Sequence, residues 1–526
     1  MTYRKTWFSC VLWILYTILC VVLLAFAGNV WVSYFAGIPY AKGFQAGTFQ
    51  PLKGLPDHIL FLIGLLLIPV AAGVYWAVRV AAGQIRKRCM FKERTTGLLE
   101  WAVVLVTIGA GVFLRVDWTG FLLRNAESGL AVPYVSGLEY YDMAVIRESG
   151  SVTPLAYGAA HLYVLCLSAA LSFLGNKLVS ALAVQVFLQI VGLLLAYTVT
   201  RKAAGRLPAC IVLIYLAFSA GYQTLIGLLG PECLFFDLYL IGMLILVSFV
   251  KAYCAERFSK ITALLGAFGT GLAIGILIYL DLAAVTILLF VTAAAAGRKQ
   301  RQEGKPGCTS PGMNGAVIFT TVLSGGLGLF GLSGIVSLSR GGNPLADLAA
   351  WADLQIGNTH AFGFGSGFPY WLDIYIIGIL VIFAAFLVFE FFRSGKEQNY
   401  MLWLLVCIVT APTPLASVGV QPFGIISMYI WAVLAGLGLQ NCIFGGSAKV
   451  MKAVIEEINS TVEQNEKEEG APEKIPEQIT KPRYIENPLP LPKKHVKKEM
   501  DYQYLVEEKD MKYDVDVSET DDFDLL

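Results

Sequence analysis

The chain has 526 residues, of which 56% are hydrophobic and 15% are charged, and its mean hydropathy is +0.65. Soluble proteins usually carry about a quarter charged residues, so the composition excludes a soluble multidomain protein and predicts a polytopic membrane protein. Residues 1–448 carry 27 Lys and Arg against 18 Asp and Glu, whereas residues 449–526 carry 12 against 20. No basic face is interleaved with aromatic residues, which argues against a nucleic-acid partner.

Apolar runs predict an all-α membrane domain over residues 1–448, with about twelve spanning helices. The first run ends in Ala25-Phe26-Ala27, which has the shape of a signal-peptidase site. This run is longer than a signal-peptide core, so it is interpreted as an uncleaved anchor. The predicted spans are 7–27, 59–82, 98–114, 179–199, 208–222, 232–250, 261–280, 282–296, 313–338, 371–391, 400–418 and 424–443.

Basic residues predict which side of the membrane each loop faces. The loops assigned to the inside carry 19 Lys and Arg, and those assigned to the outside carry 7. This bias predicts a multi-pass protein of the cell membrane with both termini in the cytoplasm and with two long outer loops, 115–178 and 339–370. The apolar stretch 157–174 is long enough to span, but spanning would turn the later basic loops outward. It is therefore predicted to lie along the outer face, or to dip into it, as a juxtamembrane helix.

Carboxylates and glycines add two further expectations. Of the 18 Asp and Glu in residues 1–448, 12 fall on the predicted outer side. Glu232 and Asp237 lie in an apolar run, and carboxylates inside a membrane are costly enough to be functional candidates. Gly271 and Gly275, with a second glycine strip at 325–331, predict close helix packing rather than ligand contact.

The last part of the chain has a different character. Residues 449–469 are predicted to form a short cytoplasmic helix. The proline-rich, acidic remainder, 470–526, has too little apolar surface to fold and is predicted to be disordered. It is either a solvated tail without a partner or a linear motif for a cytoplasmic partner.

The segment around the first long outer loop contains an ordered set of short motifs. A span ends in Phe113-Leu114-Arg115-Val116-Asp117, and the loop then contains Gly137-Leu138-Glu139-Tyr140-Tyr141-Asp142 and Thr153-Pro154-Leu155-Ala156-Tyr157. Leu174-Gly175 precedes the next span, which closes with Arg201-Lys202 and Gly205-Arg206. This order resembles the GT-C superfamily of integral-membrane glycosyltransferases, in particular the protein O-mannosyltransferase and aminoarabinose-transferase-like branch.

The resemblance covers roughly residues 98–296 and departs from the superfamily pattern in three places. The acidic pair of the superfamily, Asp-Glu, reads Leu138-Glu139 here. The first proline of its Pro-Pro-Leu turn is Thr153, and two additional predicted helices precede the match. The missing aspartate leaves open which carboxylate would act as the base.

The resemblance implies a fold and an activity. It implies a GT-C-like membrane enzyme that moves a sugar from a polyprenyl-phosphate donor, its lipid-linked partner, to an acceptor at the outer membrane face. Inverting transfer needs a carboxylate to accept the acceptor proton and a cation to hold the phosphate. The catalytic candidates are Glu139, Asp142 and Asp117, of which the first two would share one face of a helix. The substrate-binding candidates are Arg115, Arg124, Arg147, Tyr140, Tyr141, Glu232 and His360.

Other functions remain as alternatives. A divalent metal is compatible with the implied chemistry, but no ligand motif indicates one. A twelve-helix transporter or flippase would have an internal repeat, and none is visible. A polysaccharide polymerase or ligase would need paired arginines in the late outer loop, which holds only Arg340. A non-catalytic envelope scaffold is the third alternative. A spanning helix at 157–174 would favour the transporter, and an outer-face helix would favour the glycosyltransferase.

Overall fold

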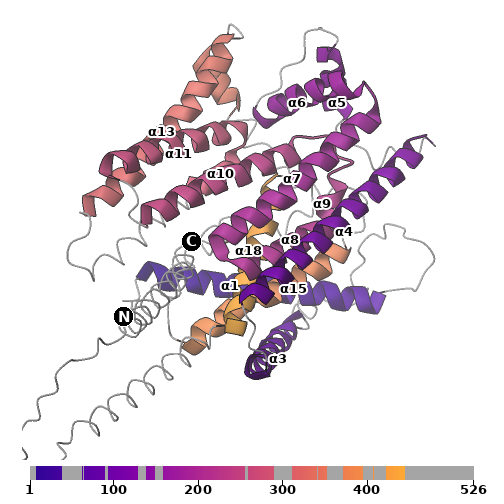
Figure 1. The fold of residues 1–526 in the computed structure, drawn as a ribbon, viewed down its shortest axis with the longest axis vertical. Helices are drawn as coiled ribbons and strands as arrows, with labels where there is room; N and C mark the ends of the chain where they lie inside the picture. The colour runs from indigo at the N-terminus through magenta and orange to yellow at the C-terminus, as the bar shows by residue number, and fades with distance from the viewer. Residues whose placement is uncertain are drawn as a thin grey trace, which may run out of the picture. The chain divides into compact units, whose positions relative to one another are not determined.

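The computed structural model describes residues 7–37, 64–88, 93–127, 138–148, 158–254, 259–288, 311–339, 342–351, 371–394 and 422–444, together with Leu62 and Cys407. The elements of this part of the chain are all helices, as the sequence predicted (Figure 1). They are α1 (Trp7–Gly37), α3 (Leu67–Arg88), α4 (Glu93–Glu127), α5 (Leu138–Glu148), α6 (Gly158–Leu174), α7 (Leu178–Ala204), α8 (Arg206–Phe218), α9 (Ala220–Thr224), α10 (Glu232–Cys254), α11 (Lys260–Leu280), η1 (Leu282–Ala284), α13 (Pro311–Ser339), α15 (Trp371–Ser394) and α18 (Pro422–Phe444).

Five stretches of these helices are long and apolar enough to cross a membrane: Gly97–Arg124, Leu178–Ala204, Glu232–Tyr253, Lys260–Leu280 and Gly315–Leu338. Shorter apolar helices occupy Cys10–Ala25, Gly158–Leu174, Arg206–Phe218, Gly378–Phe392 and Met428–Ile443. The predicted number of twelve spans stays a prediction. The predicted span 282–296 begins with the single turn η1, and 400–418 lies outside the described residues except for Cys407. The tail, 449–526, and most of the second outer loop also lie outside them.

The direction of α4 relative to α7 decides where α6 lies. Arg115 of α4 donates a hydrogen bond from Nε to Oε1 of Gln189 on α7, at 2.8 Å, and Glu100 of α4 pairs with Arg201 of α7, also at 2.8 Å. Residues later in α4 thus contact residues earlier in α7, so the two helices are antiparallel. A membrane crossing by α6 would have made them parallel. The chain between α4 and α7 therefore leaves and re-enters the bundle at one end, as predicted for 157–174.

Contacts at both ends of α6 agree with this placement. Gly158, at the start of α6, has φ +61 and lies so close to α11 that a Cβ would be 2.6 Å from the carbonyl oxygen of Leu280. The other end of α6 is joined to α7 by a short turn at Gly175, which has φ +86. Figure 1 shows α5 and α6 together at this end of α7. We call it the outer end, after the predicted topology, and the opposite end of α7 the inner end.

The structure corrects the boundary of the third predicted span. Arg115 was expected to end the span and begin the outer loop, but α4 continues to Glu127 without a break. Apolar side chains are exposed along α4 from Leu98 to Val116, a rise of about 27 Å at 1.5 Å per residue, which matches the apolar thickness of a bilayer. The helix therefore continues well beyond the predicted end of the span at residue 114.

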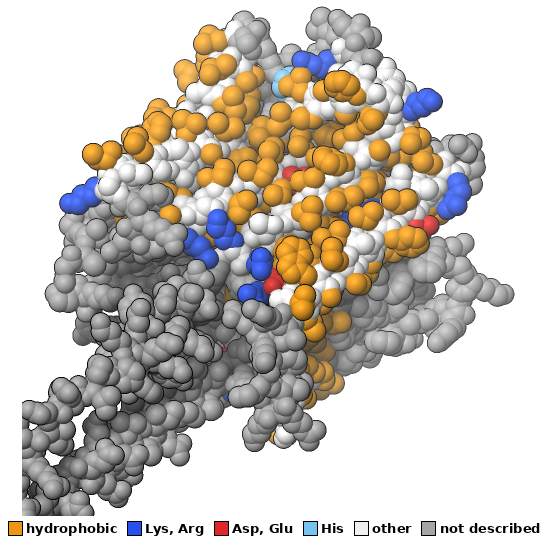
Figure 2. Space-filling view, viewed as in Figure 1, with side chains coloured by type: hydrophobic (Ala, Val, Ile, Leu, Met, Phe, Trp, Pro, Cys, Tyr) orange, Lys and Arg blue, Asp and Glu red, His pale blue; other side chains and the backbone are white. Residues whose placement is uncertain are grey.

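The predicted glycine packing occurs between α11 and α13, which lie side by side in Figure 1. A Cβ on Gly271 would collide with Ser324 and with the carbonyl of Thr321, and one on Gly275 would collide with the carbonyl of Gly325. Close approach of the two backbones replaces hydrophobic burial as the source of association inside a membrane. On the faces that do not contact each other, α11 and α13 expose apolar side chains, which Figure 2 shows in orange.

Three further helices, α1, α15 and α18, join the described bundle. Tyr16 of α1 donates a hydrogen bond to the carbonyl of Ala384 on α15, at 3.0 Å, and Trp13 stacks on Phe391 with 4.4 Å between ring centroids. Tyr429 of α18 hydrogen-bonds Thr200 of α7 at 3.0 Å. These contacts join segments far apart in the sequence around one buried apolar core.

Candidate functional site at the outer end

Three acidic residues lie at the ends of separate helices at the outer end. Glu139 is in the first turn of α5, Glu232 is the first residue of α10, and Asp281 directly follows the last residue of α11. Glu232 lies within electrostatic range of both Glu139 and Asp281. The fold brings these residues together because α5 is folded back over the bundle and α10 and α11 are antiparallel neighbours.

Hydrogen-bonding side chains of α6 and α7 connect the helices that carry these acidic residues. Tyr140 packs edge-on against Tyr163 of α6, with 6.2 Å between ring centroids. Gln185 of α7 is buried and donates from Nε2 to the Tyr163 hydroxyl at 2.7 Å and to the carbonyl of Gly230 at 3.0 Å. The Gly230 carbonyl precedes α10 by two residues, so Gln185 links α5 and α6 to the start of α10.

The environment of Tyr140 is acidic as well as partly buried. Burial raises the pKa of the Tyr140 hydroxyl, and the negative charges of Glu232 and Glu139 raise this pKa further. The hydroxyl therefore stays protonated at neutral pH and remains a hydrogen-bond donor. Burial, followed by the charge of Asp142, likewise raises the pKa of Tyr141.

Glu232 itself is held in a confined position. One carboxylate oxygen, Oε2, is buried and makes no hydrogen bond to the described residues. It lies against Gly230, where any side chain larger than hydrogen would collide with it. Unmade hydrogen bonds of buried polar atoms are uncommon in proteins, so this oxygen is available to a proton or a ligand group.

Arg115 is placed differently from the sequence prediction. It was expected to clamp a donor phosphate, but its side chain is fully buried. Besides Gln189, it donates to the carbonyls of Ala217 at 3.2 Å and Leu216 at 3.1 Å, which are in the last turn of α8. α8 ends at Phe218, so the carbonyls of its last turn lack partners within the helix. Arg115 donates to two of them and complements the negative end of the helix dipole. In the structure Arg115 thus supports the break after α8, and its predicted contact with a donor phosphate stays a prediction.

Asp237 follows Glu232 on α10 by about one and a half helical turns, toward the inner end. It is 3% exposed, and neither carboxylate oxygen has a hydrogen-bond partner among the described residues. Its Oδ1 would be 2.7 Å from a Cβ on Gly192 of α7, on the side where the Tyr222 hydroxyl also lies. The structure thus places the second intramembrane carboxylate in the interior, apart from the exposed side chain of Glu139.

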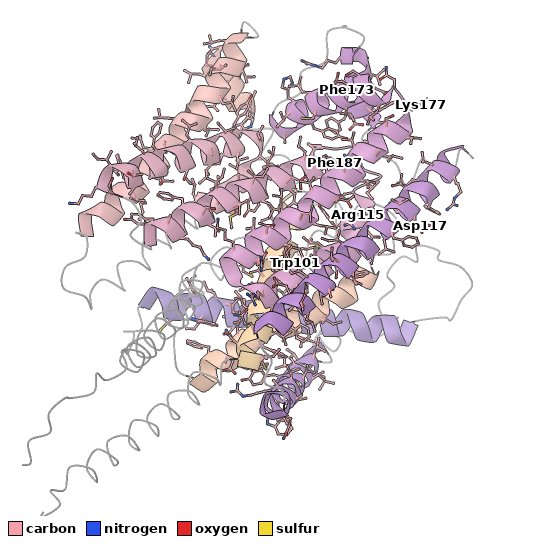
Figure 3. The ribbon with its side chains drawn as sticks, in the orientation of Figure 1. Trp101, Arg115, Asp117, Phe173, Lys177 and Phe187 are labelled. Carbon is pink, nitrogen blue, oxygen red and sulfur yellow. The ribbon has the colours of Figure 1, made fainter. Side chains whose placement is uncertain are left out.

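The other predicted site residues lie around the cluster. Asp142, one turn after Glu139, is exposed, and Arg147 is exposed in the last turn of α5. Arg124 is exposed in the last turn of α4. Asp117 is exposed on α4, directly after the last exposed apolar side chain, Val116 (Figure 3). It lies two residues after the buried Arg115, which is about 200° around the helix. His360 lies outside the described residues.

Sequence reasoning missed four supporting residues. Gln185 and Gln189, one turn apart on α7, carry the hydrogen bonds described above, and their spacing in an apolar span was a usable signal. Asp281 was among the carboxylates predicted to lie on the outer side but was not chosen as a site residue, and Tyr163 had no comparable signal, because its role depends on contacts with distant segments. In the part of the chain that the structure describes, no group of three or more His, Cys, Asp or Glu is arranged to hold a metal ion.

Comparisons with known proteins give similarity only at the level of structure. No family model and no curated protein matches the sequence. One similar structure is the oligosaccharyltransferase of Archaeoglobus fulgidus tethered to an acceptor peptide, with a TM-score of 0.40, 13% identity, and coverage of 65% of this chain and 49% of that chain. Another is the archaeal oligosaccharyltransferase AglB from the same organism, in complex with an inhibitory peptide and a dolichol-phosphate. Its TM-score is 0.39, its identity is 14%, and the match covers 68% of this chain and 52% of that chain.

The chain thus spans about half the length of these structures.

Proposed function

We propose that this protein transfers a sugar from a polyprenyl-phosphate donor to an acceptor at the outer face of the membrane. The observation that carries the proposal is the position of Glu139 and Asp281 within electrostatic range of Glu232, at the end of the bundle where the juxtamembrane helices α5 and α6 lie. A lipid-linked donor would present its phosphate and first sugar at this depth. The antiparallel arrangement of α4 and α7 supports this function over a transporter, which was expected to have a spanning helix at 157–174.

Glu139 is the proposed general base. In the reaction, an acceptor hydroxyl attacks the anomeric carbon of the donor and gives its proton to the Glu139 carboxylate. The bond between the anomeric carbon and the phosphate oxygen breaks, and the lipid phosphate leaves with that electron pair. Glu139 suits this role because its side chain is exposed at the outer end, whereas Glu232 is half-buried and one of its carboxylate oxygens is fully buried. Asp142 is the alternative base, and Asp117, which is exposed on α4, is the third.

The phosphate contacts are proposed to come from Arg124 and Arg147. Both are exposed in the last turn of an outer-end helix, and neither guanidinium is used to cap another helix as that of Arg115 is. The forked donors of arginine match a phosphate well. Tyr140, with its protonated hydroxyl, is proposed to donate a hydrogen bond to the sugar, and Tyr141 to stack on it. Glu232 and His360 remain proposed substrate contacts.

Replacing Glu139 with glutamine tests the base. Glu139→Gln keeps the side-chain volume but cannot accept the proton, so transfer of a radiolabelled sugar from a polyprenyl-phosphate donor should fall by about 10²–10⁴-fold. Donor binding, measured separately by retention of the labelled lipid, should change little. Arg147→Ala should instead weaken donor binding.

Asp142→Asn is the matched control, because it removes a carboxylate one helical turn away on the same exposed helix. Full activity in Glu139→Gln with loss in Asp142→Asn would transfer the base to Asp142. Full activity in both variants would contradict a catalytic site on α5.

A further inference from the structure

A cluster of charged residues at the inner end of α7 is separate from the proposed reaction. Glu100 of α4 is 5% exposed and accepts a hydrogen bond from the Tyr197 hydroxyl at 2.5 Å. Two arginines approach the same carboxylate, Arg201 from the end of α7 with its Nε at 2.8 Å and Arg206 from the start of α8 with its Nε at 3.6 Å. One buried acid therefore holds two guanidinium groups side by side.

The cluster keeps an excess of positive charge. The side chains of Arg201 and Arg206 are 42% and 51% exposed, and each guanidinium has five N–H donors, of which only those facing Glu100 are used there. The neighbouring Lys202 donates to the hydroxyl of Ser248 at 2.5 Å, which does not neutralise its charge. Arg201, Lys202 and Arg206 against Glu100 leave a net charge of +2.

A second ion pair predicted to lie at the inner end provides a contrast. Arg79 of α3 pairs with Glu390 of α15, and the Tyr75 hydroxyl donates to the same carboxylate at 2.6 Å. In this ion pair a single described arginine faces the glutamate, and the Arg79 side chain is only 22% exposed. A basic bias of the inner side therefore does not by itself produce an exposed pair of arginines.

The arginine pair borders the apolar outer surface of the bundle. Leu98, Leu99 and Trp101, which lie next to Glu100 on α4, are all more than half exposed. Figure 2 shows basic side chains beside an acidic one at the edge of the orange surface, in the region where Figure 3 labels Trp101. Tryptophan is favoured at the boundary between lipid tails and headgroups, so the cluster lies at headgroup depth.

We propose that Arg201 and Arg206 bind the headgroup phosphate of an anionic phospholipid in the leaflet at the inner end. The two forked guanidinium groups, fixed by Glu100, supply the donors for a phosphate. The apolar face beside Trp101 accommodates the acyl chains, and this selects a lipid over a water-soluble phosphate. The net positive charge favours an anionic lipid over a zwitterionic one.

The test uses the full chain purified in detergent, with phosphatidylglycerol and phosphatidylcholine as probes and bound lipid counted by native mass spectrometry. Wild type should retain phosphatidylglycerol preferentially. Arg206→Gln should lower the apparent affinity for phosphatidylglycerol by about fivefold, the usual contribution of one basic residue at a membrane surface. This variant keeps the shorter Arg201–Glu100 ion pair, so the fold is retained. A double variant, Arg201→Gln with Glu100→Gln, removes the other arginine without leaving an unpaired acid and should cause a similar loss.

Lys260→Gln is the matched control, since Lys260 is an exposed basic residue at the inner end, on α11. It should bind phosphatidylglycerol as wild type does. An equal loss in Lys260→Gln and Arg206→Gln would overturn the proposal, because it would indicate a response to overall charge. Equal retention of the two lipids by wild type would also overturn it. Displacement of the bound lipid by millimolar glycerol phosphate would refute the choice of a lipid over a soluble phosphate.

Discussion

Removal of the Arg115 side chain should destabilise the membrane domain rather than act on substrate binding. In Arg115→Leu, the Leu216 carbonyl and Gln189 Oε1 each lose the buried donor that Arg115 supplies. The Ala217 carbonyl keeps a second donor, Nε2 of Gln223 at 3.1 Å. An unsatisfied buried polar group costs about 1–3 kcal/mol, and removal of the buried guanidinium returns part of this. We expect the free energy of unfolding to fall by about 2–4 kcal/mol.

The chain contains its own probe for this measurement. Cys233 is buried, and its sulfur lies 3.8 Å from Nε2 of Gln189, the same amide that Arg115 orients. Its reaction with a thiol-reactive fluorophore during denaturant titration should report unfolding of this region, with Cys233→Ala identifying its share of the signal. Arg115→Lys should lose less than Arg115→Leu, because an ammonium group can still donate to one or two of the acceptors.

Arg124→Leu is the control, since it removes an exposed arginine from the last turn of the same helix. Its free energy of unfolding should remain within about 0.5 kcal/mol of wild type. If Arg115→Leu unfolds like this control, Arg115 does not support the break after α8. Unchanged stability with weakened donor binding would restore the phosphate contact expected from the sequence.

Three other predictions address packing, topology and the tail. Gly275→Ala should lower the free energy of unfolding by about 1–3 kcal/mol, because the new Cβ would collide with the carbonyl of Gly325. Gly331 has open space around it, so Gly331→Ala should leave the free energy of unfolding unchanged in the same denaturation assay. Ser151→Cys should be labelled by a membrane-impermeant thiol reagent from outside intact cells, and labelling only from the cytoplasmic side would contradict the predicted topology. Truncation after Gly470 should leave accumulation of the protein in membranes unchanged, because the removed residues carry too little apolar surface to contribute to a folded core; loss of accumulation would show that they are needed.

Features that depend on local composition could be predicted from the sequence. The helices follow from apolar runs, because a backbone in lipid must satisfy its hydrogen bonds within the segment. The close packing of α11 and α13 follows from glycines at a spacing of four, such as Gly271 and Gly275. The non-spanning position of 157–174 follows from basic residues many positions later, since the side of each loop depends on the number of crossings before it.

Features that depend on distant partners were decided only by the tertiary structure. Arg115 follows an apolar run, and in the sequence it has the same appearance as an interfacial anchor or a ligand contact. Its inward direction is set by the end of α8, about a hundred residues later, where the carbonyls of Leu216 and Ala217 need donors. The meeting of Glu139, Glu232 and Asp281 likewise requires three helix ends to lie together. Hydropathy and charge are properties of each segment by itself, whereas hydrogen bonding and electrostatic coupling depend on which segments become neighbours.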